Sequence, residues 1–113
     1  MTTKQEVTKL LSDIGVPQHL LGYRYLREVI VLCLEDQSLL RGVMDGVYVT
    51  ISEQHETNVT NLERNIRSAV VSAFKGGSND TIKAVFGNNY TKRPTNVHFI
   101  AACVYYISEF GKD

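Results

Sequence analysis

The chain has 113 residues, of which 43% are hydrophobic and 21% charged, with 12 basic and 12 acidic side chains. This length fits one domain, so we treat residues 1–113 as a single unit and exclude a multi-domain enzyme with its own cofactor domain. The hydrophobic content excludes a disordered chain. Residues 1–56 hold five basic and eight acidic side chains, whereas residues 57–108 hold six basic and two acidic ones. The basic second half can offer one surface to a polyanion.

The two cysteines, Cys33 and Cys103, lie in apolar runs with no CxxC spacing and no histidine at ligand spacing. We therefore expect reduced thiols that act as small core hydrophobes, with neither a disulfide nor a metal site. No apolar run approaches the roughly 18 residues that span a bilayer, and the polar N-terminus is not a signal peptide. The protein is expected to be cytoplasmic, with no membrane partner.

Apolar residues recur at three- and four-residue steps over most of the chain, which predicts helices. The first is expected over about 3–14, ended by Gly15 and Pro17. The second is expected over about 21–34, and a third begins near Ser38 as N-cap and includes Leu39, Leu40, Val43, Met44 and Val47.

The run from Val47 to Ile51 is rich in β-branched residues, which favours a strand by propensity. It has no partner strand or hairpin turn nearby, so we predict a short helix over about 49–54.

The strongest pattern predicts a helix over about 58–75, with Asn58 as N-cap or Thr60 and Glu63 as a competing capping box. Two further helices are expected, over about 80–86, burying Ile82, Val85 and Phe86, and from Thr95 as N-cap to about 110. The sum is an all-α domain of six to seven helices.

At 100° per residue, Glu63, Arg64 and Arg67 share one side of the 58–75 helix, opposite its apolar stripe. A helix-turn-helix has this layout: a short helix, a tight turn and a longer helix with arginines near its start. Arginine can bridge O6 and N7 of guanine, and glutamate can accept from the cytosine amino group. The alternative is a solvated face with a Glu63–Arg67 ion pair worth roughly 0.3–0.5 kcal/mol.

A basic loop before the last helix carries Lys92 and Arg93, which could hold a phosphate or simply solubilise the chain. No constellation of catalytic residues stands out. The histidines His19, His55 and His98 are isolated in sequence, the adjacent Glu35 and Asp36 point apart on a helix, and no phosphate-binding glycine loop is present. We expect no enzyme activity, no cofactor and no metal.

Several segments resemble the C-terminal DNA-binding effector domain of the master sporulation response regulator. They are Ile14-Gly-Val-Pro17, the stretch Gly22 to Glu28, Leu62-Glu-Arg-x-Ile-Arg67, Phe86-Gly87, Pro94-Thr-Asn96 and Phe99-Ile-Ala101. The resemblance spans about 7–108 with near-identical spacing. It implies a helix-turn-helix over about 48–75 whose recognition helix, about 58–75, enters the major groove at a box resembling TGTCGAA.

The resemblance also implies residue roles and partners. Glu63, Arg64 and Arg67 are the base-reading candidates, and the DNA-backbone candidates are Thr60, Asn61, Ser68, Lys92 and Arg93. The expected partners are double-stranded DNA, a second copy of the chain on that DNA and the sigma subunit of RNA polymerase.

This chain departs from the family pattern at several positions. Asn61 stands where the family usually has arginine and Ser68 where it has histidine, while Glu53 and Glu56 bring negative charge near the expected DNA backbone. Each lost phosphate contact weakens binding. The family's N-terminal receiver does not precede this domain, so we expect either a cut piece or a stand-alone effector.

Two functions follow from these observations. The first is a sequence-specific DNA-binding transcription regulator that acts without a receiver domain. The alternative is a protein-interaction module that pairs with a full-length regulator or RNA polymerase and antagonises it without binding DNA itself.

Overall fold

The computed structural model of the protein describes residues 2–41, 44–77, 79–87 and 93–111, and every regular element in these ranges is a helix. The all-α prediction is thus confirmed, with six α-helices and one 3₁₀ turn in the described ranges. None of these helices combines the length and apolar character that crossing a bilayer requires. The elements are α1 (Thr3–Ile14), α2 (Leu21–Glu35), η1 (Gln37–Leu40), α3 (Met44–Gln54), α4 (Val59–Lys75), α5 (Asp80–Phe86) and α6 (Asn96–Phe110).

Short polar side chains begin four of the helices. The side-chain oxygens of Thr2, Asn58, Asn79 and Thr95 each accept a hydrogen bond from a backbone amide in the first turn. This satisfies one of the amides that a helix N-terminus leaves without a partner. The predicted N-caps Asn58 and Thr95 are confirmed, and Gly15 ends α1 in the left-handed conformation at a φ of 109°.

The region from residue 36 to residue 54 differs from the prediction. The cap is Asp36, whose side chain accepts from the amide of Ser38 at 3.1 Å, and it opens only the 3₁₀ turn. One continuous helix, α3, then replaces the two predicted segments, since Val47 and Ile51 both pack into the core. Burial along this face overrides the β-branched propensity. Val43 lies outside the described residues.

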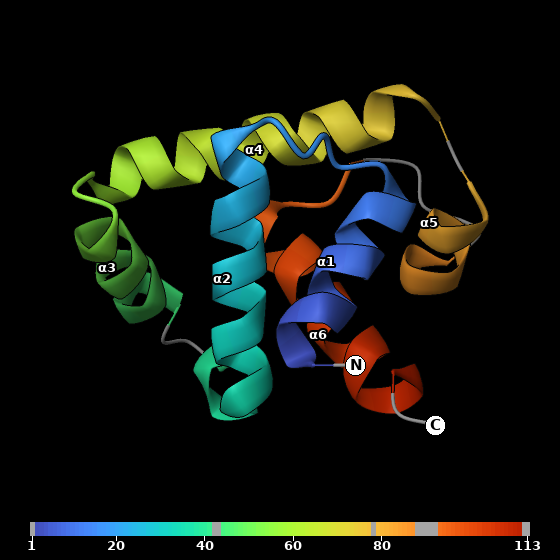
Figure 1. Ribbon diagram of the computed structural model, residues 1–113, viewed down its shortest axis with the longest axis horizontal. Coiled ribbons are helices and arrows are strands. Elements are labelled where there is room, and N and C mark those ends of the chain that lie inside the picture. Colours follow the sequence, from blue (N-terminus) through green and yellow to red (C-terminus); the bar gives the residue numbers. More distant parts are fainter. Residues whose placement is uncertain (1, 42–43, 78, 88–92, 112–113) are drawn as a thin grey trace.

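Helix α2 lies at the centre of the molecule. Figure 1 shows α4 crossing the top, α2 descending from its middle, α3 at one end, and α1 and α6 on the opposite side. Helix α2 packs against α1, α3, α4 and α6. The fully buried side chains come from α1, α2, α4, α5 and α6 and include Leu11, Leu26, Ile30, Leu62, Ile66 and Phe99, whereas the buried side chains of α3 keep a few per cent of exposure.

Two predictions about burial need correction. Val85 and Phe86 of α5 are half-buried, and only Ile82 of the predicted three is buried. Phe86 lies at the edge of an aromatic group, with ring centroids 5.4 Å from Phe74 and 5.3 Å from Phe99. The short α5 therefore covers the core from outside.

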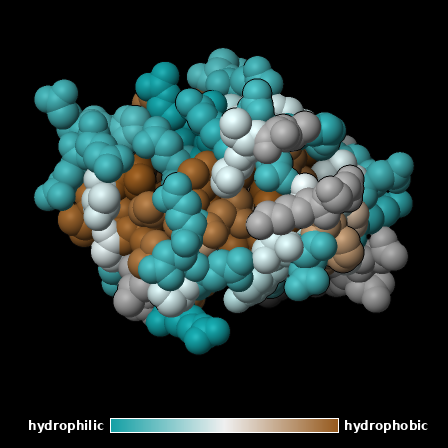
Figure 2. Space-filling view, turned by 60° about the horizontal axis from the view of Figure 1, so that its bottom comes forward, coloured by the Kyte–Doolittle hydropathy of each residue, from teal (hydrophilic) through white to brown (hydrophobic). Residues whose placement is uncertain are grey.

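Both cysteines are free and buried, as predicted. The Cys33 thiol lies 3.9 Å from the sulfur of Met44, and burial raises the pKa of Cys33 to about 11. Burial raises the pKa of Cys103 further still. Apolar side chains also reach the surface: in Figure 2 they gather in one hollowed area bordered by hydrophilic residues.

The first turn of α2 touches the backbone of α4 at Gly22. A Cβ atom added at Gly22 would lie 2.1 Å from the carbonyl oxygen of Asn65 and 2.8 Å from the Cβ atom of Ala69. Only glycine fits at this separation, so the distance between the two helices depends on this residue.

Replacing Gly22 by alanine should therefore force α2 and α4 apart. We expect Gly22→Ala to lower the free energy of unfolding in urea by about 1–3 kcal/mol, the usual cost of overpacking a core. Gly46→Ala is the matched control, because a Cβ at that position of α3 meets nothing within 4 Å. The control should gain roughly 0.5–1 kcal/mol from helix propensity. Equal stability of Gly22→Ala and wild type would contradict the close contact.

Candidate nucleic-acid interface

Helices α3 and α4 are joined by a tight turn over residues 55–58. The amides of His55 and Thr57 donate back to carbonyl oxygens of the last turn of α3, at 3.2 and 2.9 Å. Glu56 adopts a φ of +54°, in the left-handed region that residues with side chains rarely occupy. The short turn fixes the direction in which α4 leaves α3.

A side-chain pair attaches this turn to α2. The Nε2 atom of His55 lies 2.8 Å from one carboxylate oxygen of Glu28, and its ring meets that of Tyr25 edge to face at 5.1 Å. His55, although isolated in sequence, is therefore paired in the folded protein. Glu28 lies 27 residues earlier in the chain, so no local spacing could have revealed the pair.

The outward side of α4 carries the predicted recognition residues. Thr60, Asn61, Arg64, Arg67 and Ser68 are all exposed, and Glu63 at the margin is half-buried. The opposite side packs into the core through Leu62, Ile66, Ala69, Val70 and Ala73. All six candidates on this helix therefore lie on or beside one accessible face.

The charged groups of this face are not engaged in ion pairs with one another. Within the described ranges, the ion pairs are Lys9–Asp13 and Glu28–His55. The alternative Glu63–Arg67 pair is not among them, so the two guanidinium groups of α4 remain available to an external anion.

The segment before α6 meets the same side of α4. Glu63, Arg67 and Arg93 line one hollow of about 280 Å³, together with Pro94, Thr95, Asn96 and Val97. The side-chain amide of Asn96 donates to the backbone carbonyl of Glu63 at 3.0 Å, which ties the start of α6 to α4. Arg93 is thus brought beside the α4 face across a large sequence separation. Lys92 lies outside the described residues.

Asn96 is a positioning residue that the sequence analysis did not single out. It belongs to the segment Pro94-Thr-Asn96, which resembles the sporulation-regulator family. Its residue type is common in first turns of helices, so nothing in its local pattern distinguishes a contact to α4 from an ordinary exposed amide.

No metal centre is visible at this face. Within the ranges that the structure describes, no three side chains of His, Cys, Asp or Glu gather as metal ligands would. The chemistry on offer consists of two guanidinium groups, one carboxylate, and hydroxyl and amide groups. These groups can form hydrogen bonds with the base edges of a nucleic acid and can donate hydrogen bonds to its phosphates.

Tyr48 of α3 lies beneath this face and carries a buried hydroxyl group. Its side chain is 3% exposed, and the hydroxyl has no hydrogen-bond partner among the described residues. Burial, reinforced by the nearby negative charge of Glu63, raises the pKa of Tyr48 to about 12. The phenol therefore stays protonated in the folded protein under neutral conditions.

Replacing Tyr48 by phenylalanine tests this burial through pH. Below pH 10 the variant should be at least as stable as wild type, because the hydroxyl that it loses is unpaired. Above pH 10 the unfolded wild-type tyrosine ionises while the folded one does not, so wild type loses stability that Tyr48→Phe keeps, roughly 1 kcal/mol at pH 11. Urea unfolding at pH 8 and pH 11 measures the difference. The exposed Tyr105→Phe should show no such change, and a Tyr48→Phe difference independent of pH would refute the burial.

Comparison with known proteins adds one finding. The family model described as "Sporulation initiation factor Spo0A C terminal" matches residues 7–107, which is most of the chain and includes every helix that forms the face. That family consists of DNA-binding regulators of sporulation and is not a family of enzymes. Its regulators bind DNA to control transcription, which agrees with the exposed guanidinium groups of α4. The chain belongs to the family of the C-terminal domain of sporulation initiation factor Spo0A.

Proposed function

We propose that the protein is a sequence-specific regulator of transcription that inserts α4 into the major groove of double-stranded DNA. Helices α3 and α4, with the turn between them, would form the helix-turn-helix over about 48–75. The observation that carries the proposal is the outward face of α4, where Arg64 and Arg67 are exposed and form no ion pair among the described residues. An α-helix with its side chains fits the width of the major groove.

Base reading is assigned to Arg64, Arg67 and Glu63. Each arginine can donate two parallel hydrogen bonds to O6 and N7 of a guanine, and the carboxylate can accept from a cytosine amino group. Such residues fit the mixed guanine and cytosine content of a box resembling TGTCGAA. Glu63 lies in the hollow with Arg67 and Arg93. We therefore assign its base contact to the edge of the helix–DNA contact.

Phosphate contacts are assigned to residues around the base-reading set. Thr60 and Asn61 lie in the first turn of α4, where backbone amides and the helix dipole favour an anion. Ser68 lies further along the exposed face, and Arg93 projects from the segment before α6. Lys92 is assigned the same role from its sequence position alone. These contacts set the register of the protein on DNA and supply the salt dependence.

The assembly on DNA is proposed to be a homodimer on adjacent boxes, in the cytoplasm, with the sigma subunit of RNA polymerase as a further partner. A zero net charge makes this assembly useful, because each copy contributes few phosphate contacts and two linked copies bind more tightly than either alone.

Alanine substitutions at the two arginines test the readout. Arg64→Ala and Arg67→Ala should each weaken binding to a duplex that contains the box by about 1–3 kcal/mol, measured by fluorescence anisotropy at a stated salt concentration. Binding to a scrambled duplex should change much less, since the lost contacts are to base edges. The matched control is Arg41→Ala, which removes an exposed arginine just after η1, at the end of α2 remote from α4.

Two results would count against this readout. If both variants bind the box as tightly as wild type, Arg64 and Arg67 do not read it. If the purified protein binds neither duplex at low ionic strength, the DNA-binding function is itself wrong.

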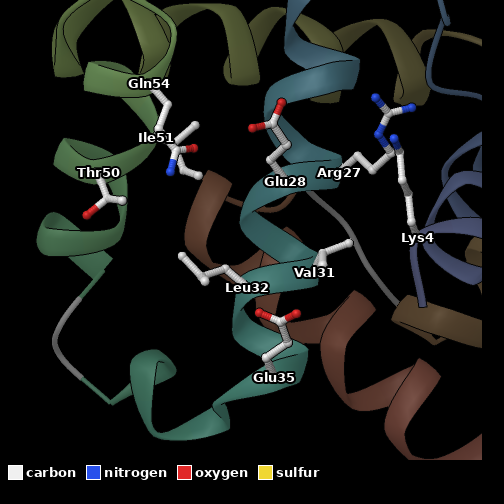
Figure 3. Close-up of a pocket in the computed structure, with 9 residues that line it drawn as sticks. All are labelled: Lys4, Arg27, Glu28, Val31, Leu32, Glu35, Thr50, Ile51 and Gln54. Carbon is white, nitrogen blue, oxygen red and sulfur yellow. The ribbon is translucent and has the colours of Figure 1, made fainter. Parts of the chain in front are cut away.

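A second candidate function is the protein-interaction module. It is favoured by a groove of about 300 Å³ between α2 and α3, lined by the apolar side chains of Val31, Leu32 and Ile51. Figure 3 shows Leu32 and Ile51 between the two helices, Val31 on the side of α2 that faces Lys4, and Glu28 and Glu35 along α2. A protein that used this groove would weaken DNA binding by a full-length regulator while binding no duplex alone. Loss of that effect in Leu32→Lys, with DNA binding still absent, would select this function.

A further inference from the structure

A second basic hollow lies on the other side of α2, where the α1–α2 turn meets the start of that helix. It has a volume of about 320 Å³ and is lined by three side chains that carry or can carry positive charge, those of His19, Arg24 and Arg27. The other lining residues are Thr8, Gln18, Leu20, Leu21 and Tyr23. None of these is acidic, whereas the α2–α3 groove carries Glu28 and Glu35 and the hollow beside α6 carries Glu63.

The cations of this hollow form no ion pair among the described residues, although Arg27 also borders the α2–α3 groove that carries Glu28 and Glu35. Among the described residues, the closest carboxylates in sequence are committed elsewhere, since Asp13 pairs with Lys9 and Glu28 pairs with His55. The buried Nε atom of Arg27 donates to no described group, although the guanidinium lies 6.0 Å from the ring centroid of Tyr23. Figure 3 shows the Arg27 side chain leaving α2 on the side of Lys4, away from Glu28. An unsatisfied buried donor is costly, and no described group forms an ion pair with the Arg27 guanidinium in competition with an external anion.

The backbone at this place also favours an anion. Helix α2 has 15 residues and begins after Leu20, which has no side-chain oxygen to accept from the first turn. No described group accepts from the amide of Leu21, an exposed residue that lines the hollow. The positive end of the helix dipole is therefore left without a capping oxygen directly beside Arg24.

The hollow adjoins the α4 face on the edge opposite Arg93. Gly22, next in the chain to Leu21, touches the Asn65 carbonyl and Ala69 of α4. At 100° per residue, Asn65 lies beside Asn61 and Ser68 on the helix circumference, whereas Arg93 meets the other margin at Glu63 and Arg67. The outward face of α4 is thus bordered by cations on both sides.

We infer that the His19–Arg24–Arg27 hollow binds a DNA phosphate on one strand while Arg93 binds the other strand across the same major groove. This inference rests on the proposed function, because it assigns a further contact to the same duplex. Two phosphate strands border the major groove on either side of an inserted helix. A protein with cationic groups along both edges of its recognition helix can contact both of them.

Arg24→Gln tests the inference, since it removes one charge at an exposed position and keeps an unbranched polar side chain. The slope of log K against log salt should fall in magnitude by about 0.9, the value for one lost phosphate contact. Equivalently, the affinity deficit of the variant should shrink by about threefold to fourfold between 50 and 200 mM salt. The deficit should be the same on box and scrambled duplexes. Arg24→Lys keeps the charge and should keep the wild-type slope, and Arg41→Gln is the matched control.

The outcomes separate this inference from the proposed function. If Arg64→Ala weakens box binding while Arg24→Gln retains the same salt slope as Arg41→Gln, the hollow does not bind DNA and the readout stands. If the wild-type protein binds no duplex, both the proposed function and this inference are wrong. Thermal unfolding of Arg24→Gln should match that of Arg41→Gln, which verifies that the fold is unchanged.

The ligand source is tested by nuclear magnetic resonance of the Leu21 amide and the Arg24 Nε–H group. Both signals should shift when duplex is added to wild type, and the Leu21 shift should be reduced in Arg24→Gln. A saturable shift with inorganic phosphate, combined with no shift on adding duplex, would assign the hollow to a free anion and overturn the inference.

Discussion

Gly22 allows the backbone of α2 to pass directly against the carbonyl oxygen of Asn65, and the position of α4 depends on that contact. Helix α2 also touches α1, α3 and α6. The distance between α2 and α4 at Gly22 therefore sets where α4 lies relative to these three helices. A side chain at position 22 would push α4 outward from the helix that supports it. The accessible face of α4 is therefore set by the absence of a side chain on its neighbour.

Polar contacts fix α4 without using its outward side. The Glu28–His55 pair holds the turn before α4 to α2, and the Asn96 amide holds the Glu63 backbone to the start of α6. Both contacts involve groups at the margins of the face or behind it. The functional side chains thus stay free while their backbone is held, which lowers the ordering cost when a ligand binds.

The helices with one strong apolar stripe could be predicted from the sequence, because the periodicity agreed with the Gly15 stop along 3–14 and with the Asn58 cap along 58–75. The prediction failed between residues 36 and 54, where Asp36 caps a local 3₁₀ turn at Ser38 and the burial of Val47 and Ile51 depends on tertiary packing. The exposure of Arg64 and Arg67 followed from helical spacing alone. The position of Arg93 beside these arginines could not be predicted in the same way. The packing of α6 brings Arg93 to α4, and helical spacing says nothing about residues this far apart in the chain.

The two buried cysteine thiols can be used to measure local unfolding of the domain. A thiol reacts with alkylating reagents as the thiolate, and burial keeps Cys33 and Cys103 protonated in the folded state. Cys33 faces Met44 at the junction of α2 and α3, whereas Cys103 lies within α6. Labelling rates at the two positions would therefore separate a local detachment of α3 from unfolding of the core that supports α4.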